Sequence, residues 1–372
     1  MRKKLTLAVA AGAAAVLAVA IEGPALGAVT APKGTANVAI TTASSDTAAP
    51  AGARTGTGNG VRVGKVKITT QLRNGRYELT DPTRGGLTTV DLGNRKGAST
   101  KSFTDMDNVW GDGSMSSRQS AAVDAHFAAE KTWDYFKNTF GRKGMRGNGQ
   151  GPVLGVHYGK GVAGAENDES PQFGDGKDDK NPLTELDVVA HELTHDLTFT
   201  AGLTNGLSES TGDIFGTMVE FYANIAADTP DYLIGEKVSL HGDGKPMRYM
   251  DKPSRDGKSL DSWKPGLDDL DDPHHAAGVA NHFFYLLAEG SGKKVINGVT
   301  YNSPTYDGSK VTGIGREKAA KIWYKALTTQ FKSTSKYKDA RAGTLKAAAA
   351  LYGKHSAEYK AVEKAWTAVN VK

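Results

Sequence analysis

The segment His191-Glu192-Leu193-Thr194-His195 combines residue types that can bind a metal ion and move a proton. Two imidazoles at positions i and i+4 lie one turn apart on one face of a helix, the spacing that two ligands of a single ion require. Zinc suits this pair, because it accepts neutral imidazole nitrogens in a tetrahedral site. Glu192 could take a proton from a water held by the metal. The alternative is a pair of core histidines without a ligand.

The surrounding sequence predicts the helix that this chemistry needs. Apolar residues recur at helical spacing on one face and leave both histidines on another: Leu186, Val189, Ala190, Leu193 and Leu197. Asn181 followed by Pro182 predicts the N-cap and the first helical residue. The two histidines are therefore expected side by side on this helix.

A third ligand is available fourteen residues after His195. Glu209 opens a second helical pattern, and a turn through Gly202 and Asn205-Gly206 would bring that helix back antiparallel to the first. Asp213 lies one turn beyond Glu209 and is placed to accept a hydrogen bond from the free nitrogen of a zinc-binding histidine. The alternative for Glu209 alone is a solvated carboxylate favoured by the helix dipole.

These segments, with Thr200-Ala201-Gly202-Leu203, Asp213-Ile214-Phe215-Gly216 and Val219 to Asn224, resemble the thermolysin family of secreted zinc metalloendopeptidases. The resemblance runs from about residue 55 to the C-terminus. It implies an α+β fold of two lobes, mostly β first and mostly helical second, with zinc bound by His191, His195 and Glu209 in the cleft between them. A zinc-protease pattern with a third histidine in the same run fails, because Thr198 and Ala201 stand where it needs Gly and His.

Composition divides the chain into four expected segments. Residues 1–28, with a basic start, an apolar run and small residues, are typical of a secretory signal peptide. Residues 29–54 are predicted to be a disordered linker or a short pro-piece. Residues 55–186 form the expected β-rich lobe, and residues 187–372 the helical lobe. The chain contains no cysteine, so we expect a secreted, extracellular protein stabilised by bound calcium rather than by disulfides.

Periodicity places the main elements inside the two lobes. Short alternating runs between turn signals predict strands in the first lobe, including residues 155–158, and helical spacing predicts a long helix over residues 121–140. In the second lobe, helical patterns cover 278–289, 315–331, 338–351 and 356–368.

The resemblance assigns further roles around the metal. Arg248 would hold the substrate carbonyl beyond the scissile bond and support the zinc-binding glutamate. His274 would stabilise the charge of the tetrahedral intermediate, and His275 is the alternative if the register slips by one. Asp269 would keep His274 charged and oriented, and Asp268 and Asp271 compete for that role.

The same alignment implies a specificity pocket walled by Val188, Ile234, Val238 and Met247. Such an apolar pocket favours cleavage on the N-terminal side of apolar residues. Two features depart from the family. The tyrosine that shares oxyanion stabilisation is missing, and Gly161 to Asn167 replaces the Asn-Ala-aromatic-Trp segment that pairs with the substrate backbone, where Asn167 could substitute.

Two sets of carboxylates resemble the calcium sites of the family. The interior set is Asp187, Glu220, Asp231 and Glu236, whose hard oxygens suit Ca²⁺ and would otherwise repel one another. Lys237 and Leu233 stand where the family often has acidic residues, which favours one ion over two. Asp105 and Asp107 resemble a surface calcium loop, although this spacing is also common in turns.

Charge limits the classes of partner. The formal charge is +5, but residues 1–54 account for +3 of it, which leaves +2 for the body. A charge of this size, without basic clusters interleaved with aromatic residues, does not indicate a nucleic-acid-binding protein. Beyond the first 28 residues no segment could cross a membrane. We expect a monomeric endopeptidase that acts on proteins or peptides. The alternative is a catalytically weak, metal-binding homologue that binds peptides or partners.

Overall fold

The computed structural model describes residues 50–372, except 98–99, 168–169, 241 and 271, and the side chain of Asp269. The expected signal peptide lies outside the described residues, as does most of segment 29–54. The first strand begins at Ala53, two residues before the expected boundary at 55. Residues 53 and 54 therefore belong to the fold.

The first half is built from two sheets and one long helix. One sheet has the order β7-β3-β2-β1-β8, and the other runs β10-β11-β9-β5-β4 with β6 beside β5. The strands are β1 (Ala53–Asn59), β2 (Lys65–Arg73), β3 (Arg76–Glu78), β4 (Thr80–Asp81), β5 (Leu87–Arg95), β6 (Lys101–Ser102), β7 (Thr104–Asp105), β8 (Val109–Trp110), β9 (Val153–Tyr158), β10 (Ala165–Asn167) and β11 (Pro171–Phe173). A short 3-10 turn, η1 (Pro82–Arg84), joins β4 to the following loop.

Helix α1 (Arg118–Phe140) packs against both sheets and confirms the helix expected over residues 121–140. It begins where the Ser117 side chain caps the backbone N–H of Ser120. It ends at Gly141, whose φ of 69° is the left-handed conformation that glycine adopts without steric cost.

The second half is mainly helical. Its helices are α2 (Leu186–Thr200), α3 (Gly206–Ala223), α4 (Pro273–Glu289), α5 (Arg316–Thr329), α6 (Tyr337–Tyr352) and α7 (Ala357–Ala368). The pairs β12 (Leu233–Ile234) with β13 (Arg248–Tyr249) and β14 (Gly292–Ile296) with β15 (Val299–Ser303) lie between them, with the 3-10 turns η2 (Pro253–Asp256) and η3 (Leu267–Asp269). The helices expected from periodicity are thus confirmed.

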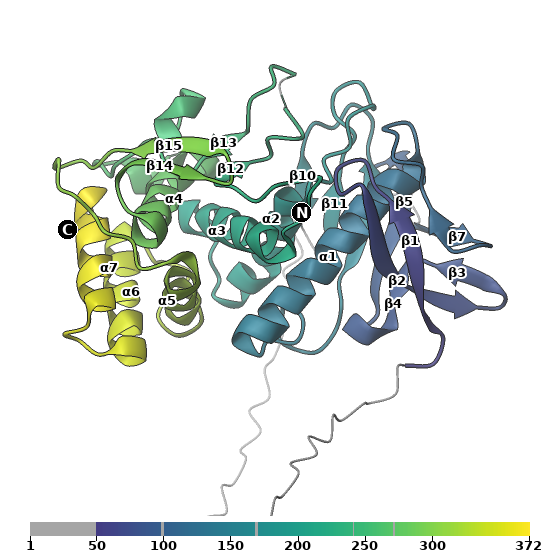
Figure 1. Ribbon diagram of the computed structural model, residues 1–372, viewed down its shortest axis with the longest axis horizontal. Helices are drawn as coiled ribbons and strands as arrows, with labels where there is room; N and C mark the ends of the chain where they lie inside the picture. The colour runs from purple at the N-terminus through teal and green to yellow at the C-terminus, as the bar shows by residue number, and fades with distance from the viewer. Residues whose placement is uncertain (1–49, 98–99, 168–169, 241, 271) are drawn as a thin grey trace, which may run out of the picture. The chain divides into compact units, whose positions relative to one another are not determined.

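Helices α2 and α3 lie in the middle of the molecule, between the β-rich half and the later helices (Figure 1). One continuous hydrophobic core runs through both halves, from Val63 to Val371. Within the described part of the chain, none of the helices combines the length and the apolar character needed to cross a membrane. The two helices of the metal-binding motif are therefore held from both sides by the same core.

The predicted start of the first motif helix was wrong. Helix α2 begins at Leu186, and Glu185 is its N-cap residue. The Asn181 side chain is instead used elsewhere: it accepts a hydrogen bond from Arg62 Nη2 and donates one to the carbonyl oxygen of Val238. A side chain committed to these partners cannot cap a helix.

Candidate metal centre and active-site cleft

Glycines let α2 and α3 approach closely. A Cβ at Gly212 would lie 2.5 Å from Nδ1 of His191, and one at Gly216 would lie 2.6 Å from the carbonyl oxygen of Asp187. Both distances are far below van der Waals contact. The bare face of α3 therefore allows the imidazole on α2 to reach the side chains of α3.

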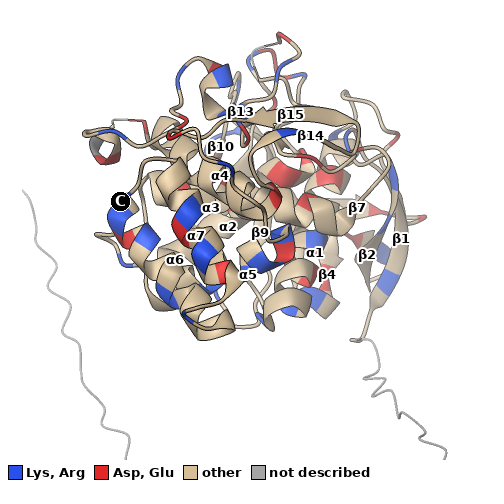
Figure 2. Cartoon of the chain, turned by 60° about the vertical axis from the view of Figure 1, so that its left-hand side comes forward, with Lys and Arg blue, Asp and Glu red and all other residues tan. Residues whose placement is uncertain are grey.

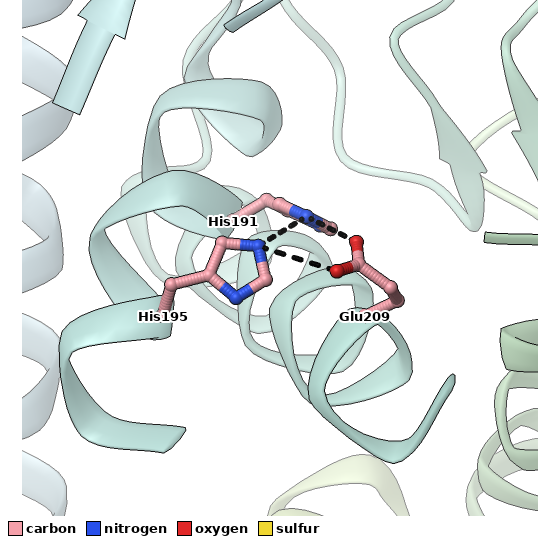
Figure 3. A group of neighbouring side chains, drawn as sticks. All are labelled: His191, His195 and Glu209. Atoms are coloured by element: carbon pink, nitrogen blue, oxygen red, sulfur yellow. Dashed lines mark hydrogen bonds and ion pairs between the residues drawn. The ribbon is translucent and has the colours of Figure 1, made fainter. Parts of the chain in front are cut away.

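The three expected metal ligands converge at this contact (Figure 3). The Nε2 atoms of His191 and His195 are 3.1 Å apart. Glu209 Oε2 lies 3.3 Å from His191 Nε2, and Glu209 Oε1 lies 3.8 Å from His195 Nε2. His191 and His195 are buried, and Glu209 is nearly so.

Each histidine points its other ring nitrogen at a specific acceptor. His191 Nδ1 is 2.8 Å from Asp213 Oδ1, the hydrogen bond expected for Asp213. His195 Nδ1 is 3.2 Å from Ser208 Oγ. The Thr198 hydroxyl donates to the carbonyl oxygen of His195, so Ser208 must donate to Thr198, 2.8 Å away, and accept from His195.

These acceptors determine what the centre can bind. With both Nδ1 atoms protonated, neutral rings direct two Nε2 lone pairs at one another and at the Glu209 carboxylate. Glu209 Oε2 is buried and has no hydrogen-bond partner among the described residues. Three convergent lone pairs require a cation, and two imidazole nitrogens with one carboxylate are a donor set that zinc accepts. The residues therefore fit zinc.

The charges around the centre hold Glu209 ionised. Burial raises the pKa of Glu209, but the nearby imidazoles, that of His191 above all, outweigh it and lower the pKa to about 2. Burial likewise opposes ionisation of Asp213, whose pKa is nonetheless lowered by Arg248 and His191. The Asp213 carboxylate accepts two hydrogen bonds from Arg248, at 2.8 and 2.6 Å, and one from Asn281. Arg248 thus reaches the metal ligands through Asp213.

A cavity of about 420 Å³ opens beside the centre. His191, Glu192, Arg248, His274 and His275 are among the residues that line it. Burial raises the pKa of Glu192, although His191 partly opposes the shift. A carboxyl group with a raised pKa at such a position can both accept and return a proton.

Of the predicted specificity residues, Val188 and Met247 line this cavity together with Leu183 and Leu240. Ile234 and Val238 are buried and are not among the lining residues. Asn167 lies close to the cleft and donates a hydrogen bond to the backbone oxygen of Glu192, and its own Oδ1 is buried without a partner among the described residues.

The two histidines of α4 are distinguished by position. His274 Nε2 lies 3.2 Å from Glu209 Oε2, whereas His275 turns toward Asp272. His274 Nδ1 also faces Asp272, at 2.9 Å, and the same carboxylate caps the helix at the His274 backbone N–H. Partial burial raises the pKa of Asp272, but the hydrogen bond from His274 outweighs this effect, and the pKa is lowered.

Asp272 was not expected in this role. Among the three candidates, Asp268 accepts hydrogen bonds from Trp263 and from the backbone of Tyr337 instead. The Asp269 side chain and Asp271 lie outside what the structure describes, so the prediction for Asp269 stays a prediction. The sequence signal for Asp272 is its place before Pro273, which marks an N-cap.

The interior carboxylates gather as expected, in a larger group. Burial raises the pKa of six carboxyl groups, and the charges of neighbouring carboxylates raise it further for all of them except Asp228: Glu185, Asp187, Glu220, Asp228, Asp231 and Glu236. Glu185, Asp228 and Glu236 have oxygens within 4.8 Å of one another. Both oxygens of Asp228 and one of Glu236 have no hydrogen-bond partner in the described residues. Sequence reasoning missed Glu185 and Asp228.

The predicted surface pair forms a turn. Asp105 Oδ1 accepts hydrogen bonds from the backbone N–H groups of Asp107 and Asn108, and Asp107 Oδ1 accepts one from Val109. One oxygen of each carboxylate is therefore hydrogen-bonded within the turn, as expected if this spacing forms a turn rather than a calcium site.

Comparisons with known proteins agree with this architecture. The thermolysin metallopeptidase catalytic domain matches residues 55–199, and the thermolysin metallopeptidase alpha-helical domain matches residues 199–371. A transglutaminase-activating metalloprotease of Streptomyces mobaraensis is 50% identical over 86% of this chain and 43% of its own length. Bacillolysin of Bacillus cereus is 37% identical over 86% of this chain and 55% of its own. The chain spans about half the length of these relatives.

Among solved structures, the precursor of protealysin, a metalloproteinase from Serratia proteamaculans, matches with a TM-score of 0.57. It is 26% identical and covers 76% of this chain and 87% of its own. Because the two domain models together cover most of the sequence and join inside the end of α2, the chain belongs to the thermolysin metallopeptidase family.

Proposed function

We propose that this protein is a zinc-dependent endopeptidase. The observation that carries the proposal is the convergence of two imidazole lone pairs and one carboxylate beside an open cavity that the half-buried Glu192 also lines. Zinc bound by His191, His195 and Glu209 would supply a Lewis acid to the peptide carbonyl and would acidify a water molecule.

The chain's own residues complete the reaction. Glu192 accepts the proton of the attacking water and returns it to the leaving amine, a role that its raised pKa favours. His274, oriented by Asp272, donates a hydrogen bond to the negative oxygen that develops on the carbonyl. Arg248 binds the substrate carbonyl beyond the scissile bond while it holds Asp213, and Asp269 remains a candidate for orienting His274.

Substrate choice follows from the cavity wall. Leu183, Val188 and Met247 favour an apolar side chain on the C-terminal side of the cleaved bond. Ile234 and Val238 are buried, and their part in substrate choice stays a prediction. Asn167 stays a candidate for pairing with the substrate backbone, which would require its buried Oδ1 to become exposed. The substrates are proteins or peptides, and the enzyme acts as a monomer.

The proposal extends to calcium and to location. A calcium ion among Asp187, Glu220, Asp228, Asp231 and Glu236 would relieve their repulsion, and Asp105 with Asp107 is a weaker second site. The signal-like segment at residues 1–28 directs the protein out of the cell.

The decisive test compares casein hydrolysis by the wild type, Glu192→Gln and the exposed control Glu363→Gln, with zinc content measured for each. We expect Glu192→Gln to keep its zinc and lose about 10²- to 10⁴-fold in rate, the usual share of a general base. Glu363→Gln should match the wild type. A chelator should abolish hydrolysis in both active proteins, and full activity of Glu192→Gln would refute the assignment.

A further inference from the structure

The last three helices carry a concentrated positive charge. Residues 316–372 contain 13 Lys and Arg against 4 Asp and Glu, a net charge of +9, whereas residues 55–315 contain 28 against 35, a net of −7. Basic residues recur along α5, α6 and α7 in Figure 2. The modest charge of the whole chain therefore hides two regions of opposite sign.

Packing turns these charges outward. The apolar sides of the helices are buried, with Trp323 of α5 and Trp366 of α7 at 1% and 0% exposure. Trp366 Nε1 donates to Thr344 Oγ1 of α6 at 2.7 Å, which fixes the rotation of one helix against the next. We call the exposed lysines opposite this packing the basic face: Lys321, Lys332, Lys338, Lys346, Lys354 and Lys360.

Few acidic residues neutralise this region. Lys318 pairs with Glu358 at 2.7 Å, and Arg341 reaches Glu363 at 4.0 Å. Within the described part of the chain, none of the six lysines of the basic face forms an ion pair. Their mutual repulsion lowers the stability of the compact fold, and a bound polyanion would relieve it.

The residue types of this region limit the class of ligand that it can bind. Eleven of the 13 basic residues are Lys, a compact point charge that binds phosphate without directional recognition. Among the large apolar residues of 316–372, Leu351 is exposed. The aromatic rings of this region are buried or half-buried. Membrane insertion needs an apolar face, single-stranded nucleic acid needs exposed rings for stacking, and protein interfaces favour Arg and aromatic anchors over Lys.

We propose that the basic face binds a flexible phosphate polyanion, an extended chain of phosphate groups that carries no bases. Such a ligand needs only repeated ammonium contacts, which the face offers across three helices. The site is separate from the zinc centre, so binding would tether the enzyme without occupying its cleft. The inference does not rest on the proposed peptidase activity.

The test uses the full chain and long-chain polyphosphate as the probe, with binding measured by calorimetry over a range of salt concentrations. Each phosphate contact contributes roughly 0.7 to the slope of log K against log salt. The triple variant Lys321→Ala, Lys346→Ala, Lys360→Ala should therefore lower the slope by about 2 and weaken binding more than tenfold at low salt.

A matched triple variant at exposed lysines of the β-rich half, Lys65→Ala, Lys101→Ala, Lys143→Ala, should bind like the wild type. Both variants should give the far-ultraviolet circular dichroism spectrum of the wild type, which shows that they fold. Equal slopes for the two variants would overturn the proposal.

Three other outcomes would also overturn it, each in favour of a different partner. Polyaspartate that binds as tightly as polyphosphate would indicate an acidic protein. Duplex DNA of equal charge that binds more tightly would indicate nucleic acid. Self-association at low salt without polyphosphate would show that the acidic region of a second copy, residues 187–315, occupies the face.

Discussion

At the scale of single residues, the two histidines proposed to bind zinc differ in the groups that orient their rings. His191 donates to Asp213, a carboxylate that is itself held by Arg248 and Asn281. His195 donates to the neutral hydroxyl of Ser208. Both arrangements fix the ring tautomer, but only the carboxylate adds charge that strengthens the imidazole as a ligand. We therefore expect His191 and His195 to contribute unequally to the affinity for the metal.

We expect Ser208→Ala to weaken zinc binding by about tenfold and Asp213→Asn by up to about 100-fold, the range found for partners of metal ligands. Competition with a chromogenic chelator would measure both. Ser208→Thr keeps the hydroxyl and should recover most of the loss. If Ser208→Ala bound zinc as tightly as the wild type, the hydroxyl groups of Ser208 and Thr198 would have no role in metal binding.

The sequence predicted that the two histidines lie side by side because their spacing is local. Positions i and i+4 on a helix determine where His191 and His195 point. Ser208 and Thr198 gave no comparable signal, since a hydroxyl gains its role only from the contact between two helices. Asp272 was missed for a related reason: one carboxylate both caps α4 and orients His274, and sequence spacing reveals only the first function.

At the scale of elements, the α2–α3 contact determines the geometry of the centre. Gly212 lies against the His191 ring, and Gly216 lies against the start of α2. Helical periodicity predicted both helices correctly but not the start of α2, because the local Asn-Pro signal was outweighed by tertiary contacts of Asn181. The close approach itself is a long-range property that no local pattern encodes.

Gly212→Ala should force α2 and α3 apart, because its methyl group would lie 2.5 Å from His191 Nδ1. We expect loss of stoichiometric zinc and a lower melting temperature, measured by metal analysis and calorimetry. Gly164→Ala is the control, since a Cβ there meets no atom within 4 Å. Full zinc occupancy in Gly212→Ala would contradict the packing argument.

The carboxylate cluster should make stability depend on pH when calcium is removed. Burial and then the charge of Asp228 raise the pKa of Asp187 to about 7, and burial raises that of Asp231 to about 6. A carboxyl pKa raised in the folded state favours folding at low pH and loses that contribution as pH rises through the folded value.

In a calcium chelator that spares zinc, the melting temperature should therefore fall from about pH 5 to about pH 8. Saturating calcium should reduce this fall, because the ion takes the place of the protons. A melting temperature that rises over this range in the chelator, or a fall that calcium leaves unchanged, would show that the cluster does not bind the ion.

At the scale of the whole molecule, the family resemblance predicted the β-rich and helical halves, which the structure confirms, whereas zinc in the cleft stays a prediction. The sequence did not predict the electrostatic division, because the net charge averages over regions of opposite sign. The order of residues along the chain does not show that lysines of three helices lie on one region of the surface. They gather only when each helix buries its apolar side and turns its polar side to solvent.

The opposed charges give the protein a large electric dipole moment, with consequences for its handling. A sequence pI near 9.0 suggests retention only on a cation exchanger at neutral pH. Because an adsorbing surface senses the nearest patch rather than the average, this molecule should also adhere to an anion exchanger through residues 187–315, which contain 19 Asp and Glu against 10 Lys and Arg. On the two resins it would be held in opposite orientations, with the last three helices against one matrix and away from the other.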